Sequence, residues 1–219
     1  MAYIEGRTVH DADAHVMELP DKILEYLAPS AVDAFIKTAN KPITVSQDLQ
    51  KAVALQSDPS FRAEDDAQLM LRKNHLALGA FEAKDRPKTL DLLGFTSQLV
   101  FTTAALGNFG LDEKDPTLAQ AAAQAHNRMN SDFCSVDPRL LATGYVPLSD
   151  ISAAPRIATE AIELGCRGLV IPSACPAHHS TSHIGLDPLW ALLEEAGLPV
   201  LFHVGGEKKM SPAYANNGG

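Results

Sequence analysis

The chain has 219 residues, of which 46% are hydrophobic and 21% charged, fractions typical of a soluble globular domain. Its 27 acidic residues outnumber its 18 basic residues, and the resulting net charge of −9 argues against partners such as nucleic acid or an anionic membrane. The first residues, MAYIEGRTVHDADAH, lack the basic and apolar segments of a signal peptide, and no apolar run reaches the roughly 18 residues of a membrane span. Three cysteines are too few for a disulfide framework, so we expect a cytoplasmic protein.

The N-terminal part of the chain predicts one strand followed by a long helical excursion. RTVHDADAH (7–15) is typical of a strand. Residues 20–80 form a polar, mostly helical insertion, in which PDKILEYL, SAVDAFIKT and DAQLMLRKNHLALGAF are the helix-like segments. The sequence contains no internal repeat.

From residue 86 onward, helix-like and strand-like runs alternate. Asp115-Pro116 and Asp187-Pro188 each place a capping acid before a proline at the first helical position, and Gly165 suits the end of a helix. Apolar residues at helical or strand-like spacing predict helices over 86–93, 115–133, 149–165 and 187–197, and strands over 98–103, 140–148, 168–172 and 199–204. A repeated strand–helix–strand unit indicates an α/β fold with a parallel sheet covered by helices.

Two architectures accept this order of elements: an open doubly wound sheet and a closed (β/α)8 TIM barrel. A dinucleotide-binding sheet carries a glycine-rich turn after its first strand, whereas this chain has DADAHVMELP there. The nucleotide-binding version is therefore disfavoured, but one sequence does not reveal strand order or closure.

Ligand-type residues stand at the ends of two predicted strands. Asp11, Asp13 and His15 alternate along the first strand, so we expect their side chains on one face. His203 follows the last apolar strand in PVLFHVGG. Taken singly, the first motif is more typical of a hydrogen-bonded strand end, and the second of a satisfied core histidine. Together they favour a site for Zn²⁺, Mn²⁺ or Fe²⁺ at the mouth of a barrel.

The chain resembles a known family along nearly its whole length outside the helical excursion. The segments that carry the resemblance are DADAHVMELP, RPKTLDLLGFTSQLVFTT, DPRLLATGYVPL, GCRGLVIPS and DPLWALLEEAGLPVLFHVGG. They resemble the amidohydrolase-related family (amidohydrolase family 2), metal-dependent (β/α)8 enzymes that include aminocarboxymuconate-semialdehyde decarboxylase and aromatic-acid decarboxylases.

The resemblance implies roles for particular residues. Asp13 and His15 match the ligand pair of the first strand, His203 matches the histidine ligand of the fifth, and Asp11 is then a supporting group behind them. The family also uses an aspartate after strand 8 and often a histidine after strand 6, and neither has a counterpart here. We therefore expect an incomplete barrel of five βα units within one domain over residues 1–219, truncated at its C-terminus, with the catalytic acid or base beyond residue 219.

Other candidate residues carry weaker signals. His178 and His179 lie in the loop after the fourth strand, on the face where such barrels bind substrate, although loop histidines are usually plain surface residues. A nucleophilic Cys175–His178 pair is disfavoured, because the prolines in this loop give no reason to expect a fixed geometry between the two side chains. Glu18 suits either the mouth of the site or the first turn of a helix. No lysine falls within a predicted strand, which argues against a Schiff-base aldolase.

We thus expect a metal-dependent hydrolase or a non-oxidative decarboxylase of a small carboxylic or aromatic acid. The implied cofactor is a divalent metal, with zinc favoured over manganese and iron. The alternative is a catalytically incomplete barrel fragment without independent activity. The expected partner is a small-molecule substrate, with no nucleic acid and no membrane, and a homo-oligomer remains open.

Overall fold

A computed structural model describes residues 2–38, 43–108, 110–173, 176 and 179–203. Its strands form one parallel sheet in the order β1-β2-β3-β4-β5. Their bounds are β1 His10–Val16, β2 Ser97–Thr102, β3 Leu140–Tyr145, β4 Gly168–Val170 and β5 Val200–Leu201. Because the order has no reversal point, the doubly wound alternative is excluded, and the expected fold, an incomplete TIM barrel, is confirmed.

The strand register brings the carboxyl ends of the strands to one edge of the sheet. Val16 at the end of β1 pairs with Thr102 at the end of β2, and Val170 of β4 pairs with Leu201 of β5. The β1–β2 ladder shifts register between Asp11 and Ala14. Side chains that follow the strands therefore gather at this edge, as they do at the mouth of a barrel.

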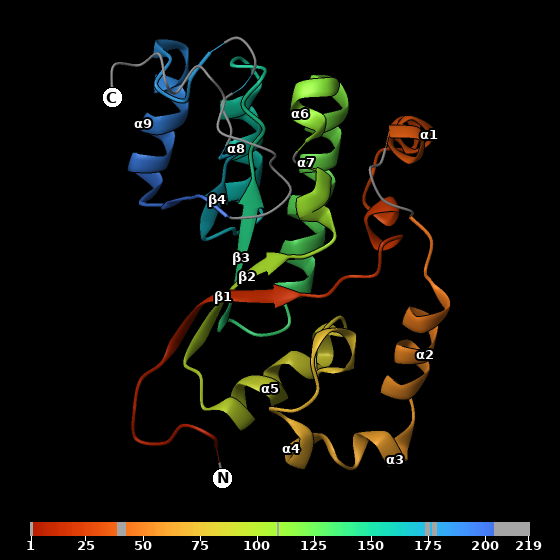
Figure 1. Ribbon diagram of the computed structural model, residues 1–219. Coiled ribbons are helices and arrows are strands. Elements are labelled where there is room, and N and C mark those ends of the chain that lie inside the picture. Colours follow the sequence, from red (N-terminus) through yellow and green to blue (C-terminus); the bar gives the residue numbers. More distant parts are fainter. Residues whose placement is uncertain (1, 39–42, 109, 174–175, 177–178, 204–219) are drawn as a thin grey trace.

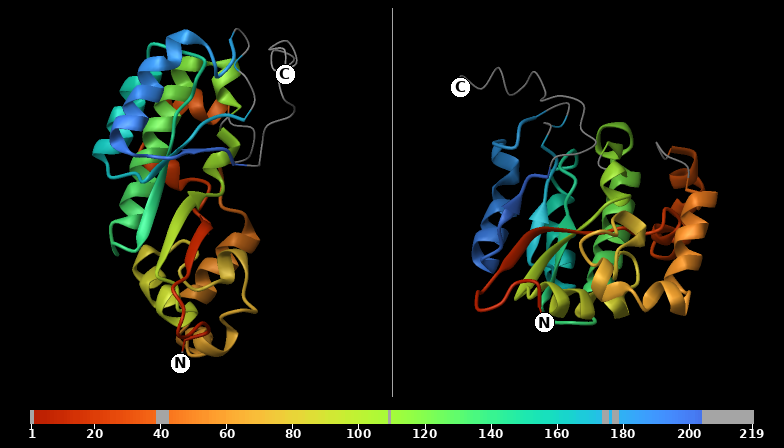
Figure 2. Two further views of the ribbon diagram at one scale, coloured as in Figure 1. Left: turned by 90° about the vertical axis from the view of Figure 1, so that its left-hand side faces the viewer. Right: turned by 60° about the horizontal axis from the view of Figure 1, so that its bottom comes forward.

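Helices pack along one face of the sheet. They are α5 Arg86–Leu93, α7 Pro116–Cys134, α8 Ala154–Glu163 and α9 Asp187–Ala196. The short α6 Leu111–Lys114 precedes α7 and packs against it. Three 3-10 turns are η3 Ala83–Asp85, η4 Ala105–Asn108 and η5 Ile184–Leu186. In Figures 1 and 2, α7, α8 and α9 stand side by side against the strands. Among the described residues, no helix combines the length and the apolar composition needed to cross a membrane.

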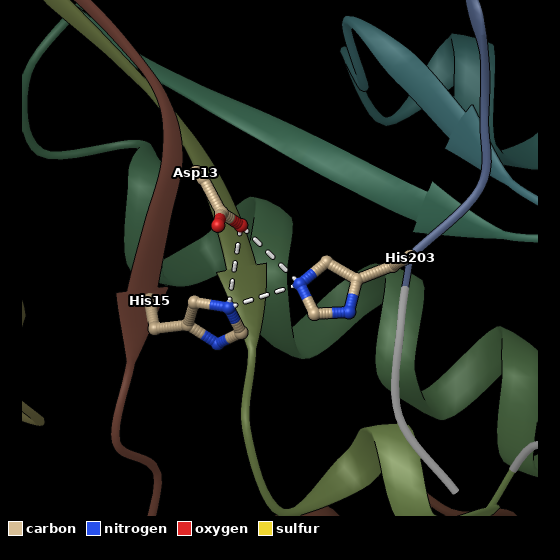
Figure 3. Close-up of side chains that lie close together, drawn as sticks. All are labelled: Asp13, His15 and His203. Atoms are coloured by element: carbon tan, nitrogen blue, oxygen red, sulfur yellow. Dashed lines mark hydrogen bonds and ion pairs between the residues drawn. The ribbon is translucent and has the colours of Figure 1, made fainter.

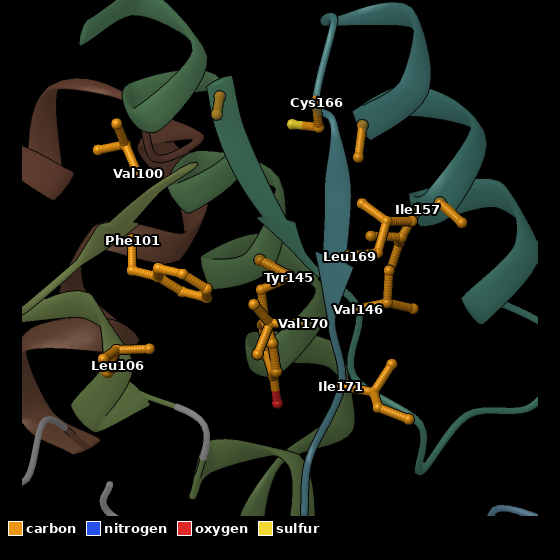
Figure 4. Close-up of a cluster of buried hydrophobic side chains, with 14 of the residues drawn as sticks. Val100, Phe101, Leu106, Tyr145, Val146, Ile157, Cys166, Leu169, Val170 and Ile171 are labelled. Atoms are coloured by element: carbon orange, nitrogen blue, oxygen red, sulfur yellow. The ribbon is translucent and has the colours of Figure 1, made fainter. Parts of the chain in front are cut away.

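The main core fills the space between the sheet and these helices (Figure 4). Val100 of β2, Leu169 of β4 and Ile157 of α8 are fully buried there. The opposite face of α7 packs on a second apolar cluster with η1 (Lys22–Glu25) and α1 (Pro29–Thr38). Because α7 is buried on two faces, it is rich in alanine, whose short side chain allows close approach on both sides.

The insertion after β1 is helical but more broken than the sequence predicts. It contains η1, α1, α2 Gln47–Gln56, α3 Pro59–Arg62, α4 Asp65–Gln68 and η2 Asn74–Leu76. A helix over the whole of DAQLMLRKNHLALGAF is wrong: Met70 and Leu71 are exposed, and the buried apolar residues Leu78 and Ala80 lie only at its end, so no continuous apolar stripe runs along it. Asn74 has a φ of 53°, which also stops a helix.

Two predicted boundaries shift for an identifiable reason. The strand predicted over 140–148 ends at Tyr145, and the helix predicted from 149 begins at Ala154. The Asp112 carboxylate accepts hydrogen bonds from the backbone N–H groups of Leu148 (2.8 Å) and Ser149 (3.1 Å). The Leu148 N–H is therefore not available to extend the strand, and the Ser152 and Ala153 N–H groups donate to Asp150 Oδ1 in a turn that precedes α8.

Candidate metal centre

Three ligand-type side chains converge at the carboxyl edge of the sheet. Asp13 and His15 come from β1, and His203 lies just beyond β5 (Figure 3). The two histidine Nε2 atoms lie 3.1 Å apart, and Asp13 Oδ1 lies 3.5 Å from Nε2 of His15 and 3.3 Å from that of His203. Residues almost 190 positions apart thus present three donor atoms to one point.

The geometry of these three atoms fits a divalent cation. A point equidistant from them lies about 1.9 Å from each, close to the 2.0–2.2 Å of zinc–nitrogen and zinc–oxygen bonds. One carboxylate with two imidazoles is a donor set that suits zinc, manganese or iron. Two facing Nε2 atoms at this distance need either a shared proton or a cation between them.

The surroundings of His15 favour its neutral form. Burial lowers the pKa of His15, and the neighbouring His203 lowers it further, while Asp13 and a hydrogen bond to the Thr102 backbone act in the opposite direction. The ring stacks on Phe101 with centroids 5.9 Å apart. A neutral imidazole is the form that binds a metal, so the site is suited to this role.

His203 is held mainly by apolar contacts. Its ring lies 4.8 Å from that of Phe101, centroid to centroid, and its side chain is 15% exposed. Its Nδ1 atom is buried and has no hydrogen-bond partner among the described residues. The ring therefore directs its hydrogen-bonding capacity through Nε2, toward Asp13 and His15.

Asp11 lies behind the cluster, and the expected regular alternation of Asp11, Asp13 and His15 along β1 is interrupted. The register shift separates Asp11 from Ala14, and Asp11 pairs with Gln98, whose side-chain amide donates to its carboxylate at 3.1 Å. Gln98 in turn accepts from the buried Arg86. The other carboxylate oxygen of Asp11 accepts from the backbone N–H of Asp13 at 3.0 Å. Asp11 thus supports the backbone of Asp13 from an anchored position.

Two further residues connect β1 with the segment after β2. The Glu18 carboxylate is buried and accepts from the backbone N–H groups of Thr103 (2.8 Å) and Ala105 (2.7 Å). Burial raises the pKa of Glu18, although these hydrogen bonds oppose the increase. The Thr103 hydroxyl lies 3.0 Å from Nδ1 of His15. Thr103 is not predicted from the sequence, where its only signal is its position directly after a strand.

The remaining candidates lie apart from the cluster. His179, in the loop after β4, lies with its Nε2 2.9 Å from the backbone oxygen of Leu148, so its ring packs against the loop that follows β3. His178 and Cys175 fall outside the described residues. His126 is buried in α7 and pairs with Thr102 Oγ1 at 2.9 Å, so it joins helix to sheet.

Comparison with protein-family models shows the family of this chain. The model described as Amidohydrolase matches residues 11–217, most of the chain. The chain belongs to this amidohydrolase family. No curated protein sequence matches it significantly. The matched range includes all three residues of the candidate metal centre.

Solved structures with the same fold include both amidohydrolases and decarboxylases. An amidohydrolase from Mycobacterium avium subsp. paratuberculosis K-10 superposes with a TM-score of 0.63 at 21% identity, covering 92% of this chain and 60% of the other. The 5-carboxyvanillate decarboxylase from Novosphingobium aromaticivorans DSM 12444, solved with bound manganese, gives 0.53 at 17% identity, covering 90% and 51%. The 2,6-dihydroxybenzoate decarboxylase from Rhizobium gives 0.52 at 16% identity, covering 98% and 55%. The chain thus spans about half to three-fifths of the length of these proteins.

Proposed function

We propose that this chain carries the metal-binding part of the active site of a divalent-metal-dependent enzyme that decarboxylates or hydrolyses a small organic acid. The observation that carries the proposal is the convergence of Asp13, His15 and His203 on one point at the carboxyl edge of a parallel sheet. In barrels of this type, that edge is where substrates bind.

Each residue of the cluster has a defined part in holding the ion. His15 and His203 would bind through Nε2, and Asp13 through Oδ1. A divalent cation held there supplies Lewis-acid chemistry, which polarises a substrate oxygen or lowers the pKa of a water molecule. Phe101 packs on both imidazole rings and excludes water from their apolar side. The exposed Asp13, 74% accessible, leaves the opposite side open to a small molecule.

Decarboxylation of an aromatic or other unsaturated carboxylic acid is the preferred reaction. Two of the three similar structures described above are decarboxylases of aromatic acids, and one of these was solved with manganese. Zinc remains the first metal to test because the site combines two imidazoles with one carboxylate, and manganese is the second. Hydrolysis is the second candidate, since the family model is that of amidohydrolases.

The first test is metal binding. We expect the chain to bind zinc or manganese at one site per molecule, and His15→Ala or His203→Ala to weaken that binding at least tenfold, because each removes one of three ligands. Competition with a chromogenic chelator measures the affinity. His10→Ala is the matched control, since His10 lies on the same strand but bonds Ser97 at the far end.

Turnover separates the two reactions. Metal-loaded protein supplied with hydroxylated benzoates should release carbon dioxide, whereas a hydrolase would instead cleave an amide or ester substrate. Both activities should disappear in His15→Ala and His203→Ala. Activity that survives both substitutions would contradict a metal-dependent mechanism at this site. Metal binding without turnover of either kind would favour the incomplete-barrel alternative for this chain.

A further inference from the structure

We propose that Thr103 is a positioning residue that fixes the tautomer of His15, so that the Nε2 lone pair of this ring is free for the cation. The inference rests on the metal site proposed above and adds to it a residue outside the ligand set. Thr103 follows β2, and the distance between its Oγ1 and His15 Nδ1 is 3.0 Å.

The direction of this hydrogen bond follows from the other partner of the threonine. The Thr103 hydroxyl lies 3.4 Å from the Met17 sulfur and is placed to donate to it. A thioether has no proton to give, so it serves only as an acceptor. Because a hydroxyl has a single proton, donation to Met17 leaves Oγ1 as an acceptor for the N–H at Nδ1 of His15.

The reverse arrangement is incompatible with a cation bound by His15. If Thr103 donated to Nδ1, the proton of a neutral His15 would sit on Nε2, which faces His203 Nε2 at 3.1 Å and Asp13 Oδ1 at 3.5 Å. That proton would occupy the place of the cation.

Thr103 is itself held in place by a buried carboxylate. Both oxygens of Glu18 accept from the Thr103 backbone N–H, at 2.8 and 3.1 Å, and one of them also accepts from Ala105 at 2.7 Å. Met17 and Glu18 directly follow β1, and the backbone N–H of Met17 donates to the carbonyl oxygen of Ala80. The residues that end the ligand strand therefore fix the threonine that orients the ligand.

The two histidines of the cluster differ in what surrounds the ring nitrogen Nδ1, which faces away from the proposed cation. The Nδ1 of His203 has no partner among residues 2–38, 43–108, 110–173, 176 and 179–203, whereas the Nδ1 of His15 lies within hydrogen-bond distance of the Thr103 hydroxyl. Groups that hold the outer nitrogen of a ligating histidine typically change metal affinity 10- to 100-fold when removed. Of the two histidines, His15 is the one whose orientation the described structure dictates.

The experiment compares Thr103→Val, which removes the hydroxyl at nearly constant shape, with Thr103→Ser, which restores it. Thr143→Val is the control, because Thr143 is a threonine of the neighbouring strand β3 whose buried hydroxyl donates to the Val100 carbonyl on the helix-covered side, away from the cluster. Zinc affinity is measured by chelator competition. Nitrogen-15 NMR of the histidine rings in the metal-free chain reports which nitrogen of His15 carries the proton.

We expect Thr103→Val to raise the zinc dissociation constant about 10- to 100-fold and to shift His15 toward the Nε2–H tautomer. Thr103→Ser should keep the wild-type tautomer and stay within a few-fold of the wild-type affinity, and Thr143→Val should change neither. An unchanged tautomer and affinity in Thr103→Val would overturn the proposal, as would an equal loss in Thr143→Val.

The NMR readout separates failure of this proposal from failure of the metal site. If the wild-type chain bound no zinc but showed Nδ1–H in His15 and lost it in Thr103→Val, the positioning role would stand and the metal site would fall. If the chain bound zinc with His15 in the Nε2–H form when metal-free, the metal site would stand and the role of Thr103 would be wrong.

Discussion

The histidines of this chain differ through what surrounds each ring. His15 lies at the carboxyl edge of the sheet, where one nitrogen faces Thr103 and the other faces two ligand-type side chains. His126 lies on the helix-covered side, fully buried between Thr102 and Asn127. The same residue type therefore serves as a candidate metal ligand in one place and as a link between helix and sheet in the other.

Burial of His126 makes the stability of the protein depend on pH. Desolvation lowers its pKa to about 4, from the ordinary histidine value of 6.5. Below pH 6.5 the unfolded chain takes up a proton that the folded chain refuses, so stability is constant above this pH and falls between pH 6.5 and 4. The loss amounts to at most about 3 kcal/mol.

His126→Gln should reduce this loss, because glutamine does not titrate. Urea unfolding at pH 7.5, 6 and 5 gives the free energy of unfolding at each pH, and the slope of this free energy against pH is compared between the variant and the wild type. His10→Gln, at an exposed histidine, serves as the control and should leave the slope as it is. Equal slopes in the wild type and His126→Gln would show that another group causes the acid sensitivity.

At the scale of the elements, glycines that end helices have unequal surroundings. Gly94 after α5 and Gly165 after α8 both adopt positive φ angles, of 78° and 87°. A Cβ at Gly94 would lie 2.1 Å from the backbone oxygen of Ile4, whereas a Cβ at Gly165 would meet nothing within 4 Å. The N-terminal segment runs against the end of α5, since Tyr3 and Ile4 donate to the carbonyls of Leu92 and Leu93.

Alanine at these two positions should therefore have different costs. Gly165→Ala should cost about 1 kcal/mol, the usual penalty of a left-handed conformation for a residue with a Cβ. Gly94→Ala should cost roughly 3 kcal/mol, because it must also displace the N-terminal segment. Free energies of unfolding in urea give both values. Equal costs would mean that the packing of residues 2–5 on α5 contributes little.

At the scale of the whole molecule, the candidate metal centre joins the two outer strands of the sheet. β1 and β5 are separated by three strands, yet His15 and His203 meet where these strands end. The curvature of the sheet brings them together, and a cation bound there would tie its ends to each other. Binding confined to the folded state stabilises it by mass action.

We expect zinc or manganese at 100 times its dissociation constant to raise the free energy of unfolding by about 2.7 kcal/mol relative to protein in chelator. The increase should vanish in His203→Ala, which removes the link to β5, and persist in the control His10→Ala. Thermal or urea unfolding with and without metal measures it. The same increase in His203→Ala would place the stabilising ion elsewhere.

The sequence by itself determined the order of the five strands and of the long helices between them, and the residue types of the candidate centre. Apolar spacing, strand-end ligands and the Asp115 cap before Pro116 are local patterns that are visible in one segment of sequence. The second predicted cap, Asp187, is wrong, because it lies inside α9 and the start of that helix has no side-chain cap. The sequence also predicted the incomplete barrel, through a family resemblance borne by motifs along most of the chain.

The tertiary structure alone decided what those local patterns become in space. The strand order, the register shift after Asp11 and the 3.1 Å approach of His15 to His203 depend on pairing between distant segments. Thr103 and Glu18 acquire their places at the site through contacts with residues 85 or more positions away. A hydrogen bond between such residues leaves no periodic trace in either segment, because it is set by how the sheet curves and how the helices pack on it.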